Sequence, residues 1–574
     1  MKVSIAKTSG FCMGVRRAVD MVLDAANTHD QPIQTFGPLI HNPQVLALLA
    51  EKNITAIDAI PRQGDGIMLI RAHGVPPDTL AALEAAGYTV VDATCPRVIK
   101  VQTIIQQHAR QGYAVIIVGD SDHPEVIGLQ GYAGGNGHVI QDMNALSRLP
   151  VFDKAIIVAQ TTQSTALFDE ITQWAEINRP EYKVFNTICP STRNRQAETE
   201  RLARSVDAMI VVGGYNSGNT QRLAQICQDT GKPVQHVETS ADLSTTGLTN
   251  ARHIGITAGA STPNWIIKKI YRELEAAYYK SKGAPLRGFF RLQRLLMLTN
   301  IYLAIGAGCL SWGATNMRHA HLFLPHTLIA VLYIFSMHTL NRLTGIEEDH
   351  YNDPYRAAFY ENNMFLLAVL AIVAGGAGLL VAFALGVFPF LLLLGMSALG
   401  LSYNLYLVPT SADRFKIKRI KDIPGSKTLL ISAAWGVTVA AFPAAAAGTF
   451  DVAAVFTAVW CAGLVFVRSA FFDIMDMQGD RIAGKETIPI LLGADRAMRL
   501  LIYILAVLFF VLPIAAFLGI IDTVGYMMMI VPAYDYLLLR LYKQDALYSG
   551  ATLEFLLESQ FYLAGIIAVI WALL

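Results

Sequence analysis

The sequence predicts two fold classes in one chain: a soluble α/β protein in the first half and an all-α membrane domain in the second. At 574 residues the chain is too long for one ordinary domain. Strands, helices and polar loops alternate up to about residue 280, whereas from Met297 onward apolar runs long enough to cross a bilayer recur. We therefore expect a soluble domain over 1–280, a basic linker over 281–295 and a membrane domain over 296–574.

Short apolar segments separated by helical ones define the first half. The expected strands lie at 66–70, 88–91, 114–118, 154–158, 208–212 and 253–257. Strands that alternate with helices favour parallel sheets. Because three cysteine motifs follow one another at intervals of about 80–95 residues, we expect three similar α/β lobes around a shared centre. These lobes would cover 14–95 together with the N-terminal strand, 96–190 and 191–280.

Three of the six cysteines stand in small motifs, GFCMG, DATCP and NTICP, at Cys12, Cys95 and Cys189. Each is expected at a strand end or helix start, where backbone N–H groups and the helix dipole favour a thiolate. Three thiolates are one ligand short of a closed tetrahedral site, which points to a [4Fe–4S] cluster with one iron open to substrate. Two alternatives stay open, namely buried thiols that only pack and a structural zinc site.

The net charge, the N-terminal segment and the cysteines indicate which partners and which compartment to expect for the protein. The formal net charge of +1 argues against nucleic acid as the main partner. The N-terminus MKVSIAKTSGFCMG is expected to form a short strand and not a signal peptide, so the first half should stay in the cytoplasm. Thiols remain reduced there, and the cysteines do not form a disulfide pattern. The other three cysteines are expected only to pack: Cys227, Cys309 and Cys461.

Polar residues outside the cysteine motifs suit an anionic ligand. Three histidines stand in loops beside Gly or Pro, and hydroxyl and amide donors stand near glycines that let backbone N–H groups approach a phosphate. These residues are His41, His73, His123, Ser217, Asn219 and Ser261. Taken alone, such a histidine is more often structural than functional, and a single Ser or Asn is equally common as a turn cap. Glu125 is the carboxylate expected to donate a proton, since burial raises a carboxyl pKa, and the nearby run 159–164 could add a hydroxyl.

The first 280 or so residues resemble the 4-hydroxy-3-methylbut-2-enyl diphosphate reductase (IspH/LytB) family. The resemblance is carried in order by GFCMGVRRA, HNPQV, AHGV, DATCP, HPEV, QTT, TICPSTRNRQ, NSGNT and TAGASTP. It implies that Cys12, Cys95 and Cys189 ligate the cluster and that the histidines with Ser217, Asn219 and Ser261 bind diphosphate. Glu125, with His123 and Thr161, would form the catalytic proton relay. Gly218 departs from the pattern, because some relatives carry a second serine there.

The resemblance also implies the chemistry. Reductive dehydroxylation of an allylic diphosphate would yield isopentenyl and dimethylallyl diphosphate, with the substrate hydroxyl on the open iron and Glu125 protonating the leaving oxygen. Electrons would come from ferredoxin or flavodoxin, since the chain shows no flavin or nicotinamide motif.

The second half predicts nine membrane spans. Each is near the ~20 residues that a helix needs to cross a bilayer. They lie at about 296–313, 320–338, 362–383, 385–406, 428–447, 451–472, 498–518, 520–540 and 556–574. The loops 414–427, 473–499 and 341–361 carry basic residues, and the opposite loops have almost none beyond Arg318. By the positive-inside rule the basic loops face the cytoplasm, which makes this a multi-pass protein of the inner membrane.

A patterned acidic segment follows the sixth expected span. Asp473, Asp476 and Asp480 share one helical face at i, i+3 and i+7. Carboxylates at the end of a membrane span are energetically costly unless they bind cations. We therefore expect Mg²⁺ to bridge these aspartates to a diphosphate, with Arg481 and Lys485 neutralising the phosphates. A solvated cytoplasmic turn is the alternative.

This segment resembles the second aspartate motif of the UbiA-like intramembrane prenyltransferases, a superfamily of nine-helix proteins. The basic stretch 418–427 also resembles the loop after their fourth helix. The first motif departs from the pattern, since only Asn341 and Asp349 match, while Arg342 and Gly345 replace acids. Glu347, Glu348 and Asp353 are candidates for compensation.

Three readings of the whole chain follow. In the first, a [4Fe–4S] reductase is fused to an Mg²⁺-dependent prenyltransferase that acts on membrane lipid or an aromatic acceptor. In the second, the same reductase carries an inert prenyltransferase-like anchor. In the third, the chain is a non-catalytic redox sensor.

Overall fold

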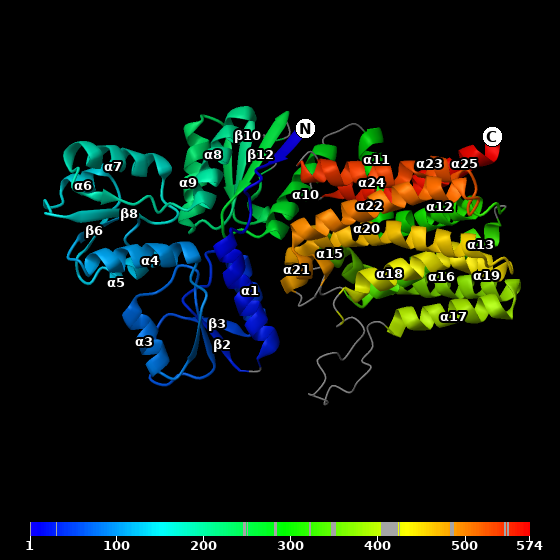
Figure 1. Ribbon diagram of the computed structural model, residues 1–574, viewed down its shortest axis with the longest axis horizontal. Coiled ribbons are helices and arrows are strands. Elements are labelled where there is room, and N and C mark those ends of the chain that lie inside the picture. Colours follow the sequence, from blue (N-terminus) through cyan, green and yellow to red (C-terminus); the bar gives the residue numbers. More distant parts are fainter. Residues whose placement is uncertain are drawn as a thin grey trace. The chain divides into compact units, whose positions relative to one another are not determined.

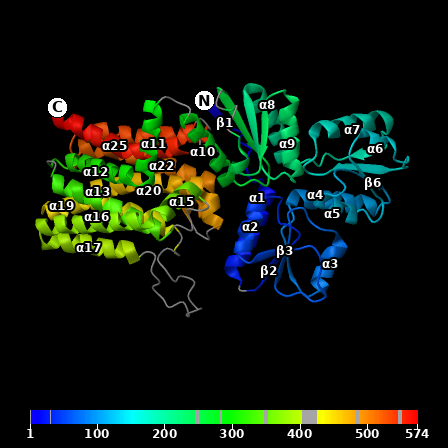
Figure 2. The same cartoon turned by 180° about the vertical axis from the view of Figure 1, so that it is seen from behind.

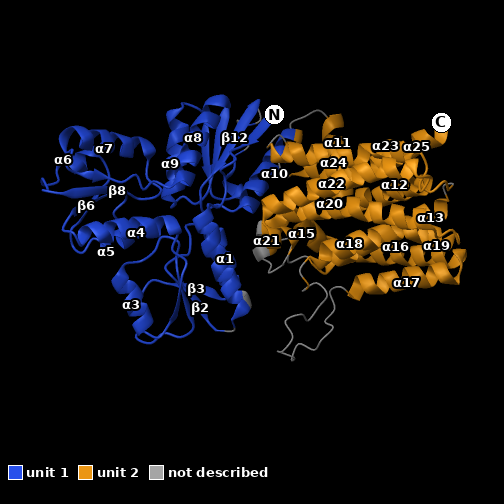
Figure 3. Ribbon diagram, in the orientation of Figure 1, with its two compact units in different colours: residues 1–278 blue, residues 279–574 orange. Residues whose placement is uncertain are grey.

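The computed structural model divides into two compact units, Met1–Tyr278 and Tyr279–Leu574 (Figure 3). The expected boundary at residue 280 lies beside this division. The structure describes all residues except 1, 30, 245–247, 249–250, 281–283, 321–322, 346–351, 403–422, 424, 483–486, 545–546 and 548–549, and it leaves out the side chains of 27, 478, 481 and 482.

The first unit contains three four-stranded sheets in which every pairing is parallel (Figures 1 and 2). One sheet has the order β3-β2-β4-β5, from β2 (Ile33–Phe36), β3 (Ile54–Ile57), β4 (Ile67–Ile70) and β5 (Thr89–Asp92). The next has the order β7-β6-β8-β9, from β6 (Ala114–Val118), β7 (Gly137–Ile140), β8 (Ala155–Ala159) and β9 (Lys183–Val184). The third has the order β1-β12-β10-β11, from β1 (Lys2–Ile5), β10 (Ala208–Val212), β11 (Val234–Val237) and β12 (His253–Ala258).

Helices separate most of the consecutive strands in all three lobes, although β4 follows β3 directly. They are α1 (Met13–Thr28), α2 (Pro43–Glu51), α3 (Pro77–Ala85), α4 (Pro96–Ala109), α5 (Pro124–Gly131), α6 (Met143–Ser147), α7 (Thr165–Asn178), α8 (Pro190–Ser205), α9 (Gly218–Asp229), η1 (Ser240–Asp242) and α10 (Asn264–Lys280). When the third sheet is read from β11 to β1, its strand order corresponds to that of the other two sheets. The strands β2, β6 and β10 are then at equivalent positions, and so are β4, β8 and β12. The three-lobe prediction therefore agrees with the described architecture.

The burial of the central strands explains why the sequence predicted their positions. Every residue of β4, β8 and β10 is buried, so each strand is a continuous apolar run instead of an alternating one. All six expected strands are present, within one or two residues of the expected bounds. The N-terminal strand was assigned to the wrong lobe: β1 pairs with β12 in the third sheet, with Val3 beside Ile254. A terminal strand can join any sheet with an unpaired edge, and the sequence pattern does not specify which.

The second unit is all-helical. Its helices are α11 (Ala284–Leu298), α12 (Ile301–Met317), α13 (Leu324–Leu343), α15 (Pro354–Asn362), α16 (Met364–Leu385), α17 (Val387–Ser402), α18 (Ser426–Gly436), η3 (Val437–Ala441), α19 (Phe442–Ala446), α20 (Val452–Ile482), α21 (Ile488–Leu492), α22 (Ala494–Phe517), α23 (Gly525–Met528), α24 (Ile530–Lys543) and α25 (Ala551–Leu573). A core around Trp435, Trp460 and Phe561 joins many of these helices. The segment expected as a linker is helical where it is described, from Ala284 onward.

Within the described residues, five helices are long and apolar enough to cross a membrane. They are Met364–Leu385, Ser426–Ala446, Val452–Met477, Ala494–Phe517 and Ala551–Leu573. A sixth is reached if α11 and α12, which meet at an angle of 75°, count as one broken span.

Helix breaks explain part of the difference from the nine expected spans. Asn300 adopts the left-handed conformation with φ of 58° and interrupts the first expected span. The eighth expected span is divided between α23 and α24.

Candidate functional site

The three motif cysteines occupy the same local position in their lobes. Cys12 is the N-cap of α1, Cys95 of α4 and Cys189 of α8, each in an extended conformation. Proline follows Cys95 and Cys189 at the first helical position, where its fixed φ suits a helix start. The Cys12 sulfur accepts a hydrogen bond from the Val15 N–H at 3.4 Å. Unpaired N–H groups and the positive end of the helix dipole favour thiolate at such positions.

The backbone attaches each cysteine to the sheet in the same way. In every lobe the cysteine N–H donates to the carbonyl two residues beyond the end of β12, β4 or β8. The pairs are Cys12 N to Ala260 O at 3.1 Å, Cys95 N to Ala72 O at 2.9 Å and Cys189 N to Thr161 O at 3.0 Å. Because these are equivalent strands of equivalent sheets, the three loops enter the centre with the same geometry.

The thiols are close enough to influence one another. Burial raises the pKa of Cys95, and the neighbouring Cys12 and Cys189 raise it further. A Cβ atom at Gly14 would lie 2.6 Å from the Cys95 sulfur, so the first turn of α1 can approach this thiol only because residue 14 is glycine. Three soft sulfur donors on three separate loops form a donor set that fits an iron–sulfur cluster.

The remaining cysteines lie apart from this centre. Cys227 is fully buried in α9 among apolar residues, and burial raises its pKa to about 12. Cys309 and Cys461 belong to helices of the second unit. Cys461 is fully buried and Cys309 is half-buried, and a packing role stays the prediction for both.

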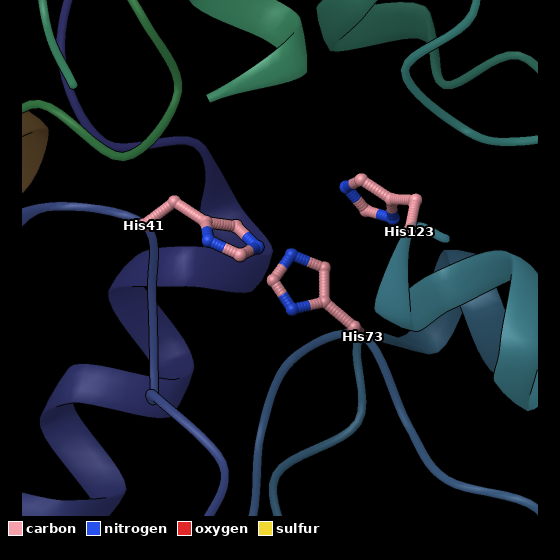
Figure 4. Close-up of side chains that lie close together, drawn as sticks. All are labelled: His41, His73 and His123. Carbon is pink, nitrogen blue, oxygen red and sulfur yellow. The ribbon is translucent and has the colours of Figure 1, made fainter. Parts of the chain in front are cut away.

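Three histidines converge beside one another (Figure 4). His41 precedes α2, His73 follows β4 and His123 is the N-cap of α5. Their ring centroids are 5.2 Å apart for His41 and His73, 5.8 Å for His41 and His123, and 5.3 Å for His73 and His123. We refer to these three residues as the histidine cluster.

Burial and positive neighbours keep the histidine cluster neutral. Desolvation lowers the pKa of His41, and Arg71 lowers it further. Desolvation lowers the pKa of His73 far more, and it lowers that of His123 to about 4. His41 Nε2 and His73 Nδ1 are buried without a hydrogen-bond partner among the described residues. The ring nitrogens of His41 and His73 can therefore donate hydrogen bonds to an anion, and the positive charge of Arg71 lies beside them.

The other expected anion-binding residues line neighbouring loops of the third lobe. Ser217 is the N-cap of α9 and Asn219 lies in its first turn, both buried. The amide nitrogen of Asn219 has no described partner. Ser261 follows β12 and donates to the His41 carbonyl at 3.2 Å, which links it to the histidine cluster. A Cβ at Gly218 would lie 3.2 Å from Arg222 Nη1, so this departure from the family pattern leaves room for the arginine.

Two arginines were missed as site residues although they stand beside quoted motifs. Arg71 lies directly before the AHGV motif, and its partly buried charge acts on all three members of the histidine cluster. Arg222 lies beyond NSGNT, forms an ion pair with Asp120 at 2.7 Å and acts on His123. For Arg222, an arginine one turn into a helix that follows a glycine-rich loop was the available signal.

Glu125 is the buried carboxyl of the centre, with 1% of its surface exposed. It accepts from the Thr161 N–H at 2.6 Å and from the Thr161 hydroxyl at 2.8 Å. Desolvation raises its pKa to about 6, although both Thr161 bonds lower it. A carboxyl with such a pKa can carry a proton near neutrality and release it.

In the second unit the acidic residues of α20 are largely enclosed. Asp473 is buried and accepts from the Thr428 hydroxyl at 2.6 Å. Asp480 is buried and accepts from Asn352 at 2.9 Å, and Asp476 is half-buried. Asn341 lies in the last turn of α13. Several expected residues fall outside the described part of the chain: Glu347, Glu348, Asp349, Lys485 and the side chain of Arg481.

Comparisons with known proteins divide the chain in the same way. Residues 3–275 match the family described as LytB protein, and residues 301–560 match the UbiA prenyltransferase family. The 4-hydroxy-3-methylbut-2-enyl diphosphate reductase of Alkaliphilus oremlandii is 43% identical over 272 residues, which are 47% of this chain and 98% of that protein.

Two solved structures are also similar to parts of this chain. The E-1-hydroxy-2-methyl-but-2-enyl-4-diphosphate reductase of Plasmodium falciparum is 29% identical, covering 48% of this chain and 87% of that one, with a TM-score of 0.46. A UbiA homologue from Aeropyrum pernix K1 is 14% identical, covering 48% of this chain and 99% of that one, with a TM-score of 0.37. The chain thus belongs to the LytB family of 4-hydroxy-3-methylbut-2-enyl diphosphate reductases, and it continues into a region that matches the UbiA prenyltransferase family.

Proposed function

We propose that residues 1–280 reduce (E)-4-hydroxy-3-methylbut-2-enyl diphosphate to isopentenyl and dimethylallyl diphosphate. The observation that carries the proposal is that the cysteine loops, the histidine cluster and the acid Glu125 are connected through neighbouring residues. Thr161 belongs to two of these groups at once, because its carbonyl accepts from Cys189 while its N–H and hydroxyl bind Glu125. The family relationship supports the same assignment.

The diphosphate would be bound by the histidine cluster with Ser217, Asn219 and Ser261. The buried, unpartnered nitrogens of His41, His73 and Asn219 are donors available to phosphate oxygens. Arg71 and Arg222 add positive charge that favours a polyanion, with Asp120 holding Arg222 in place. A substrate anchored there would extend its other end toward the cysteine loops, because Glu125 is two residues from His123 and shares Thr161 with Cys189.

Cys12, Cys95 and Cys189 would hold a [4Fe–4S] cluster, which supplies the electrons and a Lewis-acidic iron for the substrate hydroxyl. Glu125 delivers a proton to the hydroxyl oxygen on C4. The C4–O bond then breaks and the oxygen leaves as water. Two electrons enter the allylic group, and a second proton completes the product at carbon. Ferredoxin or flavodoxin is the proposed source of electrons.

Residues 296–574 are proposed to transfer a prenyl group from a prenyl diphosphate to a membrane-soluble acceptor with Mg²⁺. Asp473, Asp476 and Asp480 would bind the metal, with Asn341, Asp349, Arg481 and Lys485 completing the diphosphate site. The bond between Thr428 and Asp473 supports this, since it fixes one carboxylate oxygen and orients the other. The proposal includes nine spans in the inner membrane. It places the acidic residues and the reductase on the cytoplasmic side, with residues 281–295 as the connection between the two domains.

Turnover tests the reductase assignment directly. Anaerobically purified full-length protein, reduced by dithionite and methyl viologen, should convert the hydroxylated diphosphate to the two five-carbon products, resolved by chromatography. Cys95→Ser should abolish this conversion, and Cys227→Ser, a buried thiol away from the centre, should retain it. A parent protein that carries the cluster and forms neither product contradicts the proposal.

A further inference from the structure

Arg195 is a buried cation that the reaction outlined above does not use. It lies in α8, six residues after Cys189, and only 2% of its surface is exposed. The ion pairs among the described residues include none with Arg195, and its Nε has no partner. Enclosing a guanidinium without a counter-charge is expensive, so its placement needs a source of negative charge.

Glu198 and the cysteine centre are the neighbouring groups that could supply it. Burial lowers the pKa of Arg195 to about 10, so it remains charged at neutral pH, and Cys12, Glu198 and Cys189 oppose the lowering. Glu198 is one neighbouring anion, and its carboxylate also accepts from Lys7 N, Thr8 N and the Thr8 hydroxyl at 2.7–2.9 Å. The proposed cluster, with its Cys12 and Cys189 ligands, would add a second source of negative charge beside the guanidinium.

The hydrogen bonds of Arg195 also join two of the three cysteine loops. Nη1 donates to the Ala258 carbonyl at 2.5 Å, and Nη2 donates to the Gly10 carbonyl at 2.9 Å. Gly10 stands two residues before Cys12, and Ala258 ends β12, two residues before the carbonyl that holds the Cys12 N–H. Arg195 thus connects the helix that begins at Cys189 to both sides of the Cys12 loop.

We propose that Arg195 is a positioning and charge-compensating residue for the cluster, one that fixes the Cys12 and Cys189 loops and stabilises the added negative charge of the reduced state. The inference rests on the proposed cluster. Removing the charge should make the cluster harder to reduce, because a reduced cluster carries one more negative charge near the same position. A role in packing alone would not move the reduction potential.

The test is an anaerobic redox titration of full-length protein followed by electron paramagnetic resonance, with iron and sulfide measured on the same samples. Three variants are compared with the parent: Arg195→Gln, Arg195→Lys and Arg193→Gln. Arg193 is the matched control, since it is an exposed arginine two residues away on the same helix.

Arg195→Gln is expected to lower the ratio of reduced to oxidised cluster at least tenfold at a fixed poise, or about 59 mV for one electron. Arg195→Lys should remain within threefold of the parent, and Arg193→Gln should match it. If Arg195→Gln loads no iron, loading of Arg195→Lys at the parental potential supports the proposal.

Two outcomes overturn the proposal. One is an Arg195→Gln protein that is loaded and titrates as the parent does. The other is a lysine variant that loses as much as the glutamine variant. A parent that binds no iron–sulfur cluster would instead contradict the proposed function, so the two failures are distinguishable.

Discussion

Thr161 binds both carboxylate oxygens of Glu125, its N–H donating to one at 2.6 Å and its hydroxyl to the other at 2.8 Å. The carbonyl of the same residue accepts from the Cys189 N–H at 3.0 Å. A single residue after β8 therefore connects the acid on α5 with a cysteine loop. Since the acid is fully enclosed, its position and its proton affinity both depend on Thr161.

Replacing Glu125 by glutamine should lower kcat about 10²–10⁴-fold, because the amide is nearly isosteric but donates no proton to the leaving oxygen. Binding of the diphosphate should change little, as the histidine cluster is untouched. Steady-state turnover and equilibrium binding of substrate check the two parts. Glu170→Gln, an exposed acid on α7, is the control and should behave as the parent. Parental turnover in Glu125→Gln would show that the proton comes from another group.

The pH dependence of turnover should follow protonation of Glu125. Its pKa is raised to about 6, and the protonated form is the active one, so kcat should fall as pH rises through this value. Thr161→Val removes the hydroxyl bond that lowers this pKa but keeps the N–H, so the falling limb should move to higher pH. Profiles of kcat from pH 5 to 9 for the parent protein and Thr161→Val test this prediction. A limb that stays in place, or moves to lower pH, contradicts the assignment.

Substrate binding should be accompanied by proton uptake at the histidine cluster. In the free protein, burial and mutual repulsion lower the pKa of His73 and hold that of His123 at about 4, so both are neutral at pH 7. A bound diphosphate favours the charged imidazole, which raises these pKa values and makes affinity increase as pH falls from 8 to 6.

Titration calorimetry in buffers of different ionisation enthalpy measures the number of protons taken up. His73→Asn should reduce that number, whereas His108→Gln on α4, outside the cluster, should not. Equal uptake by the parent and His73→Asn would exclude His73 as a proton acceptor.

Prenyl transfer by the second unit should depend on Asp473. Asp473→Asn is expected to abolish Mg²⁺-dependent transfer from a labelled prenyl diphosphate in purified membranes, since it removes charge from the proposed metal site. Thr428→Val removes the 2.6 Å bond to Asp473 and should weaken transfer less severely, with a raised Mg²⁺ requirement. Asp495→Asn, an exposed acid at the start of α22, serves as control. Transfer that survives in Asp473→Asn rules out this metal site.

Residues 1–280 should fold and carry the cluster when expressed alone. The three sheets, the cysteine loops and the histidine cluster all belong to Met1–Tyr278. The isolated fragment should remain in the supernatant after ultracentrifugation, with the iron content per chain of the full-length protein. An insoluble fragment, or one that is soluble without iron, would place part of the reductase beyond residue 280.

The sequence was most informative where local chemistry decides structure. Fully buried parallel strands such as β8 are unbroken apolar runs, so their positions were predictable. The cysteines were predictable as helix starts because Cys95 and Cys189 precede proline. By contrast, the partner of β1 is β12, about 250 residues away, and nothing local to either strand specifies that pairing.

Electrostatic roles were harder to predict than ligands. Arg195 stands in a quoted motif and Arg71 directly before one, yet their importance follows from burial and from the groups that face them in space, which a sequence does not display. The membrane half shows a similar limit. Apolar length predicts a span, but it does not show that Asn300 adopts the left-handed conformation or that α23 ends at Met528.

The central claim is that three thiolates hold an iron–sulfur cluster that leaves one iron open to substrate. Mössbauer spectroscopy of anaerobically prepared, ⁵⁷Fe-labelled protein tests it most directly. The account predicts a cluster of about four iron atoms per chain in which one iron differs from the other three, and only that iron should respond to added substrate. Zinc in place of iron, or four equivalent iron atoms unaffected by substrate, would contradict it.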